Sequence, residues 1–103
     1  MMVVLEVHVG AGNVTNPTDG EFIVVEPNPV TIFPGIPTTV EVKRQLNGVI
    51  SPLAANEFCV AVWTMNPTPG LSAMAHGHFV TLTVDTTVAA GTVSNLTIDV
   101  RAS

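Results

Sequence analysis

The sequence has few charged residues, few aromatic residues and only one cysteine. Charged residues make up 11% of the 103 positions, whereas a typical soluble domain has about 25%. The sequence contains three basic and eight acidic residues, which gives a formal net charge of −5. So few cations cannot neutralise a row of phosphates. We therefore expect neither nucleic-acid binding nor attachment to an anionic membrane surface.

The single cysteine, Cys59, excludes an intrachain disulfide. No apolar run approaches the length that a bilayer-spanning helix needs. The N-terminal residues lack the basic segment and the small-residue cleavage site of a signal peptide. We therefore expect either a protein that is made in the cytoplasm or a module of a longer secreted chain. In both cases residues 1–103 form one domain, since this length supports one hydrophobic core.

The residues that are abundant favour strands. Valine alone supplies 18 positions, and the eight prolines and eight glycines are scattered between apolar segments. Apolar and polar residues alternate in eight segments bounded by turn residues, which is the period of a half-buried strand. These segments are Met2–Val9, Glu21–Glu26, Val30–Phe33, Thr38–Leu46, Val49–Leu53, Glu57–Met65, Gly77–Asp85 and Val93–Val100. Short strands at this spacing predict an all-β, antiparallel β-sandwich of seven to eight strands.

Local signals refine this prediction. Asn47-Gly48 is a preferred pair for a two-residue hairpin turn. The prolines around Val30–Phe33 indicate an edge strand or a strand that changes sheets. Leu71–Ala75 is the one candidate for a helical turn. Glu57–Met65 has two apolar faces, which predicts a central strand or one that a partner covers. One face holds Phe58, Val60 and Val62, and the other holds Cys59, Ala61, Trp63 and Met65.

From Val25 onward, the order of these signals resembles bacterial immunoglobulin-like domains, which occur in surface adhesins and phage virion proteins. The matching residues are Val25-x-Pro27-x-x-Val30-x-Ile32-x-x-Gly35, Thr39-Val40-x-Val42, Trp63-Thr64-x-Asn66-Pro67, Gly77, Val80-Thr81, Ala90-Gly91-Thr92 and Leu96-Thr97-Ile98. The resemblance implies an immunoglobulin-like sandwich with a role in display, adhesion or assembly. It implies no catalytic residues and no cofactor. The first twenty residues have no counterpart in it.

Met74, His76 and His78 form the one sequence cluster with metal-binding chemistry. Thioether and imidazole ligands suit copper, and two histidines can begin a zinc site. The spacing matches neither a zinc motif nor a blue-copper motif. The alternative is a loop whose histidines cap a strand or contact solvent. We predict no bound metal and keep these three residues as candidates.

No motif in the sequence indicates a particular reaction. No serine lies in a G-x-S-x-G motif, and Cys59 lies in the middle of a predicted strand, where a thiol is usually buried and inert. Trp63 occupies a position at which sandwich folds bury a tryptophan. It therefore does not indicate a platform for sugars. We expect no enzymatic activity and no small-molecule substrate.

Two features favour assembly. Met2–Val9 is a long apolar strand, and an unpaired strand of this kind would pair with another chain. Residues 10–20 are polar and rich in turn residues, so residues 1–20 are a candidate assembly arm. The alternative is that Met2–Val9 is the first strand of its own sheet. The predicted interface residues are Val3, Leu5, Val7, Trp63 and Met65.

The leading hypothesis is a structural protein such as a phage capsid decoration or virion accessory protein. It would be made in the host cytoplasm, act at the virion surface, and bind copies of itself or a capsid lattice. The second hypothesis is an adhesin or cell-surface module from a longer secreted protein. The third is a small metal-binding sandwich protein that uses Met74, His76 and His78.

Overall fold

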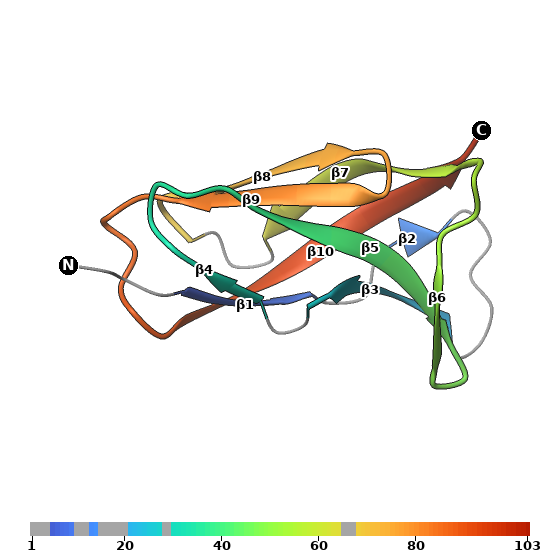
Figure 1. Cartoon of the computed structure of the whole chain (residues 1–103), viewed down its shortest axis with the longest axis horizontal. Helices are drawn as coiled ribbons and strands as arrows, with labels where there is room; N and C mark the ends of the chain where they lie inside the picture. The colour runs from blue at the N-terminus through green and yellow to red at the C-terminus, as the bar shows by residue number, and fades with distance from the viewer. Residues whose placement is uncertain (1–4, 10–12, 15–20, 28–29, 65–67) are drawn as a thin grey trace.

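A computed structural model describes residues 5–9, 13–14, 21–27, 30–64 and 68–103, and within these it describes the side chains of residues 23–27, 30–62 and 68–103. The described residues form ten strands and no helix (Figure 1). The strands are β1 (Leu5–Val9), β2 (Asn13–Val14), β3 (Glu21–Glu26), β4 (Val30–Ile32), β5 (Thr38–Leu46), β6 (Val49–Pro52), β7 (Glu57–Thr64), β8 (Leu71–His76), β9 (Phe79–Val84) and β10 (Thr92–Ala102). The all-β prediction is confirmed, and the eight predicted segments correspond to all the strands except β2 and β8.

Two five-stranded sheets share one core. In the first sheet, β10 lies between β7 on one side and β1 with β2 on the other, and β4 follows β1. In the second, β5 lies between β3 on one side and β9 with β6 on the other, and β8 follows β9. Most pairs are antiparallel, but β1 and β2 run parallel to β10.

Alternation along the strands builds the core between the sheets. In β10, Leu96, Ile98 and Val100 are buried, as predicted, while Asn95 is exposed. Strand β9 contributes Val80, Leu82 and Val84 in the same way. Further buried side chains come from β3, β4 and β5, so both sheets supply the apolar surface whose burial stabilises the fold.

The expected turns are present. Asn47 and Gly48 both have positive φ, of 50° and 81°, as a two-residue type I′ turn requires. Leu46 therefore faces Val49 across the β5–β6 hairpin. Strand β4 ends its sheet and pairs only with β1 among the described strands, so the predicted edge position is confirmed.

The helical turn expected at Leu71–Ala75 is wrong, because these residues form most of β8. Strand β8 pairs with β9 along its whole length. Leu71, Ala73 and Ala75 pack against the core, while Ser72 and Met74 are exposed. This alternation is that of a strand, and the pairing with β9 outweighs the local preference of alanine for helix.

The two faces predicted for Glu57–Met65 are also wrong. The register between β7 and β10 shifts, because Val100 pairs with Cys59 whereas Asp99 pairs with Ala61. Val60 is therefore an extra residue, a β-bulge that reverses which residues face the core. Cys59 is buried and Val62 packs against the core, although an unbroken alternation puts them on opposite faces. Strand β7 pairs only with β10 among the described strands, so it is not central.

Candidate functional site

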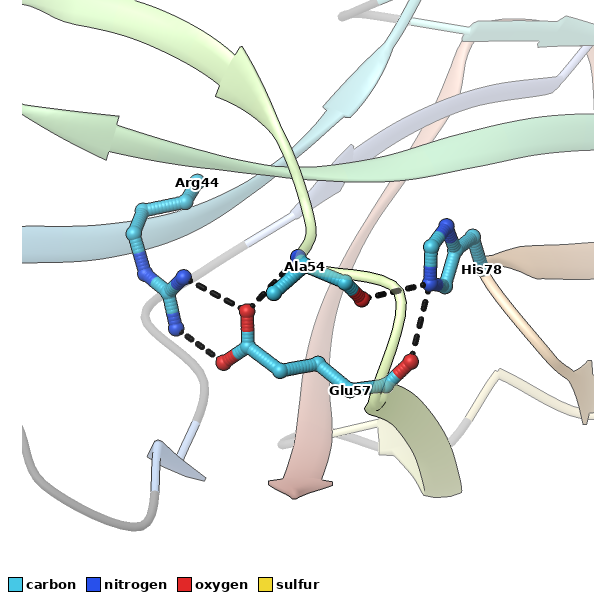
Figure 2. A network of polar contacts seen from close by, with 4 residues as sticks. All are labelled: Arg44, Ala54, Glu57 and His78. Carbon is cyan, nitrogen blue, oxygen red and sulfur yellow. Dashed lines mark hydrogen bonds and ion pairs between the residues drawn. The ribbon is translucent and has the colours of Figure 1, made fainter. Parts of the chain in front are cut away.

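Four residues from different segments form a polar network beside the start of β7 (Figure 2). Arg44 comes from β5, Ala54 from the β6–β7 connection, Glu57 from the start of β7 and His78 from the β8–β9 turn. Arg44 Nη1 donates to Glu57 Oε1 at 2.7 Å, and Nη2 donates to Oε2. The Ala54 N–H also donates to Glu57 Oε1, at 2.8 Å. We call these four residues the latch.

The latch holds an ionised carboxylate. The side chain of Glu57 is only 10% exposed. The hydrogen bonds from Arg44 lower the pKa of Glu57 below its ordinary value of 4.5, with a further lowering by the Ala54 N–H, and together they outweigh the opposing effect of burial. An ion pair with two parallel hydrogen bonds is stronger than a neutral hydrogen bond, so the carboxylate is fixed in place.

His78 connects the other side of the latch. Its Nε2 lies 2.8 Å from the carbonyl oxygen of Glu57 and 3.1 Å from that of Ala54. Because both partners can only accept, Nε2 carries the proton and donates to them. The main chain of the same turn adds two bonds, from the Val42 N–H to His78 O at 2.7 Å and from the Cys59 N–H to Gly77 O at 2.8 Å. The latch therefore fastens the start of β7, in one sheet, to β5 and the β8–β9 turn of the other.

The candidate metal ligands do not converge. Met74 is 72% exposed and faces Thr81 across the hairpin. His76 is the last residue of β8, whereas His78 lies in the turn and has its Nε2 engaged in the latch. Among the described residues, no group of three or more His, Cys, Asp or Glu side chains is arranged to hold a metal ion.

The thiol of Cys59 is not placed for chemistry. Cys59 is buried in the core, and this burial raises its pKa to about 11. Since the thiolate is the nucleophilic form, such a thiol is inert at neutral pH.

Part of the predicted N-terminal interface is paired within its own sheet. Val3 and Met65 lie outside the described residues. Leu5 and Val7 belong to β1, whose residues 5–7 pair with β10 on one side and β4 on the other. The free edge expected for Met2–Val9 is therefore wrong for this part, and β1 is a strand of its own sheet. Trp63 pairs with Thr97 of β10, and its burial stays a prediction.

A cluster of exposed apolar side chains that was not predicted lies at the turn of the β5–β6 hairpin. Leu46, Val49 and Ile50 surround the Asn47-Gly48 turn and are 40%, 67% and 46% exposed. We call these three residues the hairpin tip. Every residue of β6 is exposed, and positions 45–52 contain no charged residue. Figure 1 shows the β5–β6 hairpin extending beyond the body of the sandwich. The signal was available in the sequence, as apolar residues on both sides of a turn.

Further large apolar side chains are exposed on the sheets. They are Phe58, Val60, Met74, Phe79 and Val93, and Ile36 is exposed in the β4–β5 connection. Strands β7 and β8 lie side by side where the two sheets meet (Figure 1). Exposed apolar side chains therefore occur on both sheets as well as at the hairpin tip.

Comparisons of the chain with protein-family models, curated proteins and solved structures found no match. The resemblance to immunoglobulin-like domains thus stays a prediction. A search of the described residues for a helix long and apolar enough to cross a membrane found none.

Proposed function

We propose that this protein is a non-enzymatic structural module that acts by binding other protein chains. The observation that carries the proposal is the hairpin tip, where three large apolar side chains are exposed within a stretch, positions 45–52, that has no charged residue. Burying one such side chain fully is worth about 1.5–3 kcal/mol. Leu46 and Val49 face each other on one side of the hairpin, and Ile50 lies on the other side. Exposed apolar surface is a mark of interaction sites.

Contact through side chains fits the hairpin better than the addition of a strand. Leu46 and Val49 close a two-residue turn and therefore form a hydrogen-bonded pair. The alternation along the hairpin puts Pro52 at a position whose main-chain groups point away from β5. Because proline has no N–H, it weakens this edge as a template for a new strand. A partner would therefore bind Leu46, Val49 and Ile50 through their side chains.

Within this class, we propose a capsid decoration or virion accessory protein that forms a homo-oligomer or binds a capsid lattice. Its place of action would be the virion surface, after synthesis in the host cytoplasm. The single core, the scarcity of charge and the exposed apolar side chains on both sheets support a protein that functions in contact with many copies of a partner. Binding at many equivalent sites would stabilise a shell by mass action.

Sedimentation equilibrium at several protein concentrations tests the proposal. We expect a trimer or a larger symmetric assembly that dissociates on dilution. A strict monomer at all concentrations would contradict self-assembly and favour a module from a longer surface protein.

A further inference from the structure

Three connections meet at the end of the sandwich that lies opposite the hairpin tip (Figure 1). They are the β4–β5 connection, residues 68–70 just before β8, and the β9–β10 connection. The Gly35 N–H donates to Val84 O at 2.9 Å, and the Asp85 N–H donates to Gly70 O at 3.0 Å. These bonds tie the β4–β5 connection to the end of β9 and the β9–β10 connection to Gly70, so the surface between them is formed before any ligand binds.

A pocket of about 470 Å³ lies between these connections. Its lining residues are Pro34, Gly35, Gly70, Ser72, Thr83, Val84, Asp85 and Thr86. Asp85 is the one charged residue among them. The rest of the lining is formed by small, apolar or hydroxyl-bearing residues.

The carboxylate of Asp85 is held in a fixed orientation. Its Oδ1 accepts hydrogen bonds from the Thr87 N–H, at 2.9 Å, and from Thr87 Oγ1. These bonds lower the pKa of Asp85 below its ordinary value of 3.8, so the carboxylate is ionised at neutral pH. Among the residues that the structure describes, no hydrogen bond reaches Oδ2.

Gly70 makes room for this carboxylate. A Cβ at Gly70 would lie 2.4 Å from Asp85 Oδ1 and 2.8 Å from its Cγ, which is closer than real atoms approach. The φ angle of Gly70 is +87°, a region that residues with a side chain rarely adopt. Glycine at this position is therefore required for the carboxylate to occupy its observed place in the pocket.

We propose that this pocket binds a lysine side chain presented by a partner protein. The inference rests on the proposed function, because it names the chemistry of one contact with a partner. A lysine can bury its methylene stem along an apolar wall such as Pro34 while its ammonium group reaches a charge. The ammonium group complements the one carboxylate of the pocket on a chain whose net charge is −5.

Lysine fits this carboxylate better than arginine. The guanidinium group pairs best when both oxygens of a carboxylate are available to its two parallel donors. At Asp85, Thr87 already occupies Oδ1 with two hydrogen bonds. One open oxygen suits the compact charge of an ammonium group.

A nuclear magnetic resonance titration of the ¹⁵N-labelled chain with Nα-acetyl-lysine methylamide tests the inference. We expect saturable shifts of the Gly35, Gly70 and Asp85 amides. The neutral norleucine analogue and the arginine analogue should bind more weakly. Asp85→Asn keeps an oxygen for the Thr87 bonds and should weaken lysine binding about threefold to fivefold, as expected for an exposed ion pair. Glu41→Gln removes the same charge from β5 and should leave binding unchanged.

The inference is overturned if Asp85→Asn binds lysine as tightly as the unaltered chain, or if the shifts lie outside the pocket. Should Asp85→Asn fail to fold, the affinity of the unaltered chain at rising salt concentration decides, since only an ionic contact weakens. Failure here leaves the assembly proposal intact, because sedimentation tests that proposal separately. A monomer that still binds lysine would overturn only the assembly proposal.

Discussion

The two hairpins whose two-residue turns the structure describes differ in how their turns are held. The β5–β6 hairpin turns at Asn47-Gly48 and the β8–β9 hairpin at Gly77-His78, and both turns contain a glycine with positive φ. The second turn is fastened by the latch through His78 and through two main-chain bonds. The first carries the exposed hairpin tip and contains no charge.

We infer that this difference separates the residues that stabilise the fold from the residues that the proposed assembly would use. A turn that donates and accepts hydrogen bonds across two sheets contributes to the folded state, so changes to it should alter the free energy of unfolding. A turn whose apolar side chains contact solvent contributes little to that free energy. Its side chains gain stabilisation only when a partner covers them.

The largest effect on stability is expected from Glu57→Ala, which breaks the latch. The change leaves Arg44 and the Ala54 N–H without the carboxylate. We expect the free energy of unfolding to fall by about 2–3 kcal/mol, because a partly buried ion pair with two hydrogen bonds is lost. Urea denaturation measures this. Glu26→Ala is the matched control, since its pair with Lys43 is more exposed, and it should cost under about 1 kcal/mol. Equal effects of the two variants would contradict the latch.

A smaller loss is expected from His78→Ala. The carbonyl oxygens of Glu57 and Ala54 then lose their donor. We expect a loss of about 1–2 kcal/mol in the free energy of unfolding. His76→Ala removes the same side chain from an exposed position two residues earlier and should change stability by less than about 0.5 kcal/mol. If His76→Ala were the more costly change, the role given to His78 would be wrong.

The latch also predicts a pH dependence. The pKa of Glu57 is lower in the folded state than its ordinary value of 4.5. The stabilisation is therefore fully present well above pH 4.5 and is lost as the pH falls through the folded-state pKa. Glu57→Gln lacks this contribution, so the difference in stability between the two proteins should shrink from pH 7 towards pH 3. Denaturation curves at several pH values would show a constant difference if the carboxylate were not ionised in the latch.

The smallest effect on stability is expected from Val49→Thr combined with Ile50→Thr, which alters the hairpin tip. Threonine keeps the β-branched shape that suits a strand, so the free energy of unfolding should change by less than about 0.5 kcal/mol. Association should weaken at least tenfold, since each change removes apolar surface from the contact. Sedimentation and urea denaturation of the same variant measure the two effects. A large loss of stability with unchanged association would reverse the assignment.

Local patterns predicted the strands but not their partners. The alternation in Val93–Val100 predicted a half-buried strand, and the Asn47-Gly48 pair predicted a hairpin turn. Each signal extends over only a few residues, and both predictions are confirmed. The bulge at Val60 reverses an alternation that the residues themselves do not interrupt. Strand β8 depends on its pairing with β9, which outweighs the helix preference of its alanines.

The latch could not be predicted from the sequence, because it is formed by residues that lie far apart in the chain. Arg44 and Glu57 are separated by the β6 hairpin arm, and His78 comes a further 21 positions along the chain from Glu57. No local spacing indicates that these residues meet. The sequence indicates His76 and His78 as candidate metal ligands, whereas in the structure His78 Nε2 belongs to the latch. The exposed hairpin tip could have been predicted, because its signal is local.

Whether the hairpin tip is the contact surface is tested directly by following the amide resonances of the chain as its concentration is raised. We predict that the amide resonances of Leu46, Val49 and Ile50 shift or broaden with concentration, while those of the latch residues Glu57 and His78 stay unchanged. Resonances that are independent of concentration at the hairpin tip, or changes confined to another surface, would contradict it.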